Sequence, residues 1–166
     1  MMIETIQKLY DYNYWANALL LEKAAEVDPA QLKATTAYSF GSLFGTLVHT
    51  MSAEWMWRLR MQEGRSPERL HTGDDFAGLQ GIRDFWTGEE GQMRAFLSGL
   101  SDDALMQPIF YTNTSGQMQR NLLWESLQHL VLHGMQHRSE IAIMLTDYGH
   151  SPGWIDFIRY VREQQG

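Results

Sequence analysis

The segment from Asn121 to Tyr148 constrains the fold more than any other part of the chain, because it is apolar around most of a helical circumference. Gly149 and then Pro152 follow it, as is typical where a helix ends. A helix with so little polar surface needs neighbours on most of its sides. The segment therefore predicts an all-α protein in which this helix lies inside a bundle.

Three further segments carry apolar residues at steps of three and four, the spacing of an amphipathic helix. The first runs from Ile3 to about Val27, where Asp28-Pro29 ends it. The second begins near Ser39 or Ser42, either of which can cap free amides, and ends at Gly64. The third, roughly Phe76 to Leu100, contains four glycines that each cost up to about 1 kcal/mol relative to Ala: Gly78, Gly81, Gly88 and Gly91. Together the four segments predict a four-helix bundle.

The remaining segments predict shorter elements. Polar Gly64 to Asp75 predicts a loop, and Ser101 to Asp103 predicts a short capped turn. A small β-hairpin is expected before the last long helix, because Asn113-Thr114-Ser115-Gly116 separates Ile109–Thr112 from Gln117–Arg120. Apolar residues at helical spacing predict a short C-terminal helix from Trp154 to Arg162 that lies across the bundle.

Composition narrows the classes of function. A chain of 166 residues with 44% hydrophobic residues predicts one domain over residues 1–166. The net charge of -7 and the scattered basic residues argue against nucleic-acid binding. No stretch approaches the roughly 20 apolar residues that cross a bilayer, and the start lacks a leader pattern, so we expect a cytoplasmic protein. Because the chain has no cysteine, a metal would bind imidazole, carboxylate or water.

Histidines are the candidate ligands. His129, His133 and His137 stand four residues apart and share one face of the last long helix. Two imidazoles at this spacing can reach one ion, but His129 and His137 are about 12 Å apart along the axis. One ion therefore takes two of the three and needs a ligand from another helix. His49, in an otherwise apolar stretch, is the natural third, since a buried imidazole needs a polar partner.

Simpler interpretations compete with a metal site. The spacing H-x-x-x-H occurs by chance, and a single buried histidine is more often a hydrogen-bonded core residue. Ser126, Gln136 and Glu140 lie on the same stripe as the histidines, which favours a polar cavity inside the bundle. Neither the H-E-x-x-H of zincins nor the paired Glu-x-x-His of di-iron bundles is present. A single mononuclear site is therefore the metal hypothesis.

Three motifs resemble those of the DinB/YfiT-like family. Tyr12–Asn17 resembles the family's Y-x-x-W-A-N, and His49–Leu59 resembles its H-x-x-x-A-E-x-x-W. His129–Arg138 is similar to its H-V-x-N-H-x-x-H-H-R signature. The resemblance spans nearly the whole chain and implies a four-helix bundle grouped with metal-dependent thiol transferases and maleylpyruvate isomerases. Three positions depart from the family's common residues: Leu132, Gln136 and Glu140.

Carried over residue by residue, the resemblance implies metal ligands at His49, His133 and His137, with water or substrate completing the sphere. It also implies a homodimer. We expect simpler roles for the other polar and aromatic motif residues: Trp15 and Trp57 in the core, Asn17 and Arg138 in hydrogen bonds or ion pairs, Glu54 solvated or paired, and His71 and His150 away from the metal.

Function follows from the expected site. The first hypothesis is an enzyme in which a divalent metal, zinc or nickel first, activates water or a low-molecular-weight thiol for hydrolysis or transfer on a small-molecule substrate. Glu140 or His129 would move the proton or support a ligand, and for His129 the alternative is a donor in the pocket. The second hypothesis is a non-catalytic metal-binding or stress-response protein whose metal is structural or sensory. A bundle without a cofactor is the third hypothesis, and we rank it last because it leaves buried imidazoles without hydrogen-bond partners.

Overall fold

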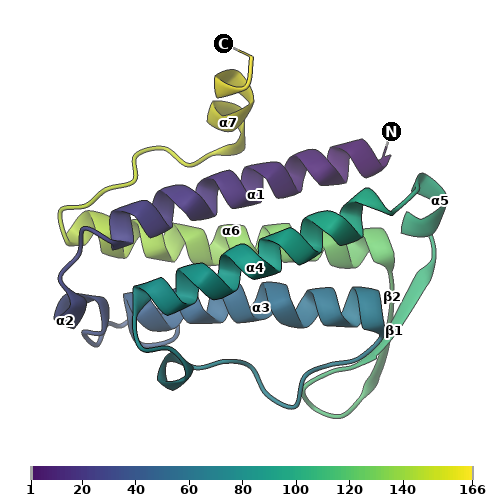
Figure 1. Ribbon diagram of the computed structural model, residues 1–166, viewed down its shortest axis with the longest axis horizontal. Coiled ribbons are helices and arrows are strands. Elements are labelled where there is room, and N and C mark those ends of the chain that lie inside the picture. The colour runs from purple at the N-terminus through teal and green to yellow at the C-terminus, as the bar shows by residue number, and fades with distance from the viewer. Residues whose placement is uncertain (1, 166) are drawn as a thin grey trace.

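The computed structural model describes residues 2–165 and is a four-helix bundle, as the sequence predicts. Its long helices are α1 (Met2–Ala24), α3 (Leu43–Glu63), α4 (Leu79–Ser98) and α6 (Leu123–Asp147). A two-stranded antiparallel hairpin, β1 (Pro108–Thr112) and β2 (Met118–Leu122), precedes α6 and lies at one end of the bundle (Figure 1). The C-terminal helix α7 (Phe157–Glu163) stands outside the bundle beside α1.

Local chemistry sets the ends of the helices. Ser42, one of the two predicted caps, accepts a hydrogen bond from the Gly45 amide and starts α3, and Gly64 ends it in the left-handed conformation at φ 66. The third long helix is shorter than predicted, since it starts after Gly78 rather than at Phe76. Its internal glycines are tolerated because Ile82, Trp86, Met93 and Leu97 are buried against the bundle.

Three short helices complete the fold: α2 (Pro29–Leu32), the 3-10 turn η1 (Gly73–Asp75) and α5 (Asp102–Leu105). The sequence predicts a capped turn where α5 lies, but it predicts only a helix end and a loop where α2 and η1 lie. Helix α1 ends at Ala24, earlier than the predicted end at about Val27, and Asp28 instead caps α2 by accepting a hydrogen bond from the Ala30 amide. A single turn is too short to show a helical period, which is why both were missed.

The predicted burial of α6 and of the C-terminal segment needs correction. Helix α6 packs against α1 and α3, yet Leu132, Met135 and Ile143 are exposed on its outer side. Trp154 is 80% exposed, so it does not pack across the bundle, and α7 starts only at Phe157, where Asp156 caps it. Apolar content alone therefore overstated how completely these segments are covered.

No helix within residues 2–165 combines the length and apolar character needed to cross a membrane.

A buried polar network joins the four long helices. The Glu54 side chain of α3 is 1% exposed and accepts hydrogen bonds from Asn13 and Asn17 of α1 and from the Trp86 indole of α4. Arg138 of α6 donates to the amide oxygens of both asparagines. The sequence left Glu54 either solvated or paired, and the structure pairs it. The hydrogen bonds expected for Asn17 and Arg138 are present.

Candidate metal centre

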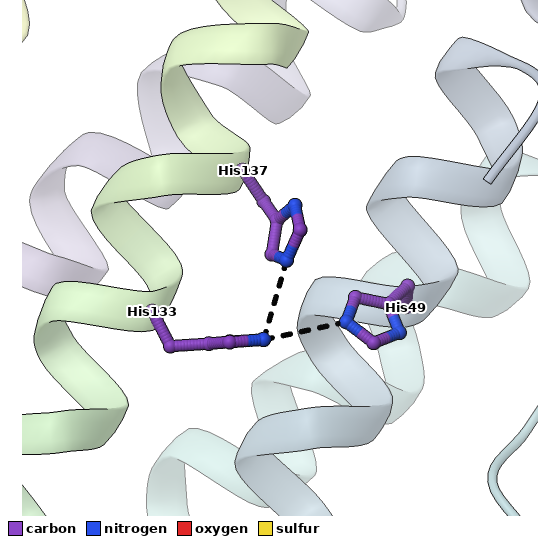
Figure 2. Close-up of side chains that lie close together, drawn as sticks. All are labelled: His49, His133 and His137. Atoms are coloured by element: carbon purple, nitrogen blue, oxygen red, sulfur yellow. Dashed lines mark hydrogen bonds between the residues drawn. The ribbon is translucent and has the colours of Figure 1, made fainter. Parts of the chain in front are cut away.

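Three histidines from two helices converge on one point. His49 lies on α3, and His133 and His137 lie one turn apart on α6, with all three rings directed toward one another (Figure 2). Nε2 of His133 is 3.4 Å from Nε2 of His49 and 3.2 Å from Nε2 of His137. One nitrogen of each ring lies within 4.8 Å of the other two. The structure thus brings together the three residues predicted as ligands.

The donor set fits a metal ion. Four ligands placed tetrahedrally about 2.0 to 2.1 Å from zinc lie about 3.3 to 3.4 Å from one another, close to the two Nε2 separations of 3.2 and 3.4 Å. A neutral imidazole has one donor and one acceptor nitrogen. The Nε2 atom of His133 therefore cannot form a full hydrogen bond with both His49 and His137. The Nδ1 atom of His133 is also buried without a protein partner. A cation accounts for converging lone pairs that hydrogen bonding leaves unexplained.

Electrostatics keeps His49 and His133 uncharged. Burial, together with repulsion from His137 and His133, lowers the pKa of His49 to about 4. Burial and the neighbouring His137 likewise lower the pKa of His133 to about 4. Both rings are therefore neutral at pH 7, the form that ligates metals.

Glu140 contacts the Nδ1 atom of His137, the ring nitrogen that does not face the cluster. Its Oε2 atom lies 3.0 Å from Nδ1 of His137, and its Oε1 atom accepts a 2.8 Å hydrogen bond from the Ser39 hydroxyl. Partial burial acts to raise the pKa of Glu140, but the hydrogen bonds from His137 and Ser39 bring it below its ordinary value. The carboxylate accordingly favours a proton on Nδ1 and leaves the Nε2 lone pair directed into the cluster.

Phe40 covers one side of the cluster and was not predicted from the sequence. Its ring stacks on His49 with centroids 3.6 Å apart and planes at 11°, and it meets His137 edge-on at 5.3 Å. The backbone of Phe40 is left-handed at φ 60, which is unusual for a residue other than glycine. A Cβ at position 45 would lie 2.3 Å from the Phe40 carbonyl oxygen, so Gly45 permits this close approach.

His129 lies apart from the cluster. Its ring centroid is 5.8 Å from that of His133 and 5.0 Å from that of Trp57, and it is hydrogen-bonded to no other residue in the part of the chain described. It lines a hollow of about 310 Å³ that none of the three clustered histidines lines, so His129 is the residue between this hollow and the cluster. The other lining residues are Trp57, Tyr111, Asn121, Glu125 and Ser126. Burial and the charge of Arg60 lower the pKa of His129. Of the two roles considered for this residue, the position suits a pocket donor.

The remaining candidates lie elsewhere. Ser126 hydrogen-bonds its own helix at the Leu122 carbonyl, and Gln136 is exposed, so of the predicted polar stripe Glu140 alone touches the cluster. His71 packs against Trp55 and His150 pairs with Glu26. Trp15 and Trp57, expected in the core, are half-buried at its edge.

Comparison with known proteins identifies one family and two similar folds. A model of the DinB family matches residues 2–166. The chain is 24% identical over 161 residues to protein DinB of Bacillus subtilis (strain 168), covering 93% of this chain and 92% of that protein. Its fold is similar to that of YfiT from Bacillus subtilis, a probable metal-dependent hydrolase with an unusual four-helix bundle topology, at a TM-score of 0.63 and 16% identity over 89% of this chain and 90% of YfiT. A mutant of the mycothiol-dependent maleylpyruvate isomerase matches at a TM-score of 0.51 and 10% identity over 87% of this chain and 61% of the isomerase.

Proposed function

The chain belongs to the DinB family, and from this premise we propose that it is a metal-dependent enzyme in which His49, His133 and His137 bind one divalent ion. The observation that carries the proposal is the convergence of three imidazole nitrogens, all within 4.8 Å of one another and with two separations of 3.2 and 3.4 Å. Zinc is our first choice of metal and nickel our second, because both accept imidazole ligands.

The reaction we propose is hydrolysis or thiol-dependent transfer on a small molecule. Three neutral imidazole ligands would leave the charge of a divalent ion uncompensated, so a bound ion would supply Lewis acidity to a water or a thiol. The two reaction classes are those named for the structural neighbours: YfiT is a probable metal-dependent hydrolase, and the isomerase depends on the thiol mycothiol.

Residues near the cluster have different proposed roles in the reaction. Glu140 orients His137, and because both of its carboxylate oxygens are already engaged, we assign it a positioning role rather than proton transfer. His129 has ring nitrogens without a protein partner and lines the adjoining hollow, so it is our candidate to hold or move a proton at the substrate. Trp57 offers an aromatic surface in the same hollow.

Elemental analysis of gently purified protein tests the ligand set. We expect about one equivalent of zinc or nickel per chain in the wild type, as for a mononuclear site, and loss of metal in His49→Ala, His133→Ala and His137→Ala. His150→Ala is the matched control, because it removes an imidazole that pairs with Glu26 away from the cluster. Wild-type protein that lacks metal and resists reconstitution, or triad variants that keep it, would overturn the proposal.

A non-catalytic role is the second candidate, and the stacking of Phe40 on His49 favours it, because the ring covers one side of the cluster. The absorption spectrum of the cobalt-substituted protein separates the two. New bands on addition of 2-mercaptoethanol indicate an open position and support the enzyme. An unchanged spectrum, together with no turnover of thiol-transfer, ester, amide and lactone substrates, supports a structural or sensory metal.

A further inference from the structure

A second hollow lies away from the histidine cluster. It has a volume of about 660 Å³ and is formed where the end of α1, the short helix α2 and the start of α4 meet, at the end of the bundle opposite the hairpin (Figure 1). Its wall is largely apolar and includes Val27, Leu32, Phe44 and Leu79, and no histidine lines it. Its size is that of a pocket for a small organic ligand.

Two cations face this hollow without acidic partners. Lys33 and Arg83 both line it, and within residues 2–165 neither forms an ion pair. The Lys33 ammonium lies 4.8 Å above the ring of Phe44. Arg83 donates to the Leu21 carbonyl oxygen, while its Nε atom is buried without a hydrogen-bond partner. Positive charge is therefore left uncompensated here, in a chain whose net charge is -7.

The acidic residues that neighbour the lining in the sequence bond to other partners. Asp28 accepts from the Ala30 amide, and Asp84 accepts from the Gln80 side chain. No Asp or Glu is part of the described lining. Glu26, next to the lining residue Val27, bonds to Lys23 and His150. The protein itself thus supplies no carboxylate to Lys33 or Arg83.

The start of α4 adds to the positive potential. This 20-residue helix begins at Leu79, and its N-cap residue Gly78 offers no side chain to cap the first amides. Both residues line the hollow. Free amides at a helix N-terminus favour a negatively charged group, so the helix end acts in the same direction as the two cations.

From these observations we propose that the hollow binds a small carboxylic acid with an apolar body. The carboxylate would lie between Lys33 and Arg83, near the start of α4, and the apolar body would lie against Val27, Leu32 and Leu79. Charge complementarity selects a carboxylate over an alcohol, and the apolar wall selects it over a fully hydrated anion. This site is independent of the metal proposed at the histidines.

Octanoate is the probe for this site. In a titration of the full chain followed by 1H–15N correlation spectra, octanoate is expected to shift the amides of Ala30, Gly78 and Leu79. Octan-1-ol, which has the same chain without the charge, should bind more weakly. Phosphate, which has the charge without the chain, should also bind more weakly. Octanol that binds as tightly as octanoate, or octanoate that leaves these amides unmoved, would overturn the proposal.

Matched variants test the two cations. Lys33→Ala and Arg83→Ala should each raise the dissociation constant of octanoate about two- to fivefold, the effect of removing one partly exposed charge pair. Lys8→Ala removes an exposed lysine of α1 outside the hollow and should leave it unchanged. Because Arg83 also bonds to Leu21, Arg83→Lys serves as a second variant that keeps the charge and should keep most of the affinity. Equal effects of Lys8→Ala and Lys33→Ala would contradict the assignment.

Discussion

The Glu54 network and the histidine cluster both involve α3 and α6, but different partners complete them. Glu54 accepts hydrogen bonds from Asn13, Asn17 and Trp86, all within the protein. In the histidine cluster, the ring nitrogens face one another instead, and the Nε2 atom of His133 lies 3.4 Å from that of His49 and 3.2 Å from that of His137. A buried polar side chain that bonds to donors from other helices joins those helices. Ring nitrogens that face one another instead point to a ligand between them.

Electrostatics separates the two groups further. Burial raises the pKa of Glu54, but donors from Asn13 and Trp86 and the charge of Arg138 act against that rise. Burial lowers the pKa of His49 and His133, and their histidine neighbours lower it further. The network around Glu54 thus contains its own counter-charge. His49 and His133, in contrast, have no counter-charge of that kind and favour the neutral form.

The largest expected effect is loss of stability in Glu54→Ala. Removing the carboxylate leaves the donors of Asn13, Asn17 and Trp86 without an acceptor and Arg138 without its nearest negative charge. We expect a loss of about 3 to 5 kcal/mol in the free energy of unfolding, because each buried donor left without an acceptor costs about 1 to 3 kcal/mol. Urea denaturation of metal-free protein measures it.

His133→Ala in metal-free protein is the comparison for that experiment. It removes a half-buried ring that has a nitrogen without a partner, so the loss of stability should be clearly smaller than in Glu54→Ala. Metal content should show the reverse order. His133→Ala should lose the metal, and the folded fraction of Glu54→Ala should retain it. Equal losses of stability would remove the distinction between the two groups.

An intermediate effect is expected for Glu140, the residue that supports the cluster from outside. Glu140→Ala removes the acceptor of His137 Nδ1, and loss of a partner of this kind weakens metal affinity about 10- to 100-fold. Glu140→Gln keeps an oxygen that can accept the same hydrogen bond and should weaken binding less. Competition of each protein with a chromophoric zinc chelator measures the affinity. If Glu140→Ala binds zinc as tightly as the wild type, Glu140 does not position His137.

The same comparison explains what could be read from the sequence. Spacing along one helix places His133 and His137 together, and the cap and C-terminal glycine of α3 mark its ends at Ser42 and Gly64, so the fold and the cluster were predictable. The roles of Glu54 and Phe40 depend on contacts between distant segments, which no local pattern encodes. The homodimer stays a prediction, because a single chain contains no contact that tests it.

The smallest expected effect concerns the backbone of Phe40, which lies at φ 60. A left-handed conformation costs roughly 1 to 2 kcal/mol for a residue with a Cβ and nothing comparable for glycine, whose extra freedom in the unfolded chain offsets about 0.5 to 1 kcal/mol. Phe40→Gly should therefore be more stable than Phe40→Ala by about 0.5 to 1 kcal/mol, as thermal unfolding would show.

Both Phe40 variants remove the ring stacked on His49, so they should release zinc to EDTA faster than the wild type, and by the same factor. Equal stability of the two variants would mean that the φ of Phe40 is not a source of strain. Unchanged release of zinc would mean that the ring does not shield the site. Suppose that both variants release zinc faster than the wild type, at equal rates, and still differ in stability. The ring of Phe40 would then shield the cluster, while its backbone conformation affects stability alone. That result would also place the Phe40 side chain, unlike that of Glu54, among those that control access rather than stability.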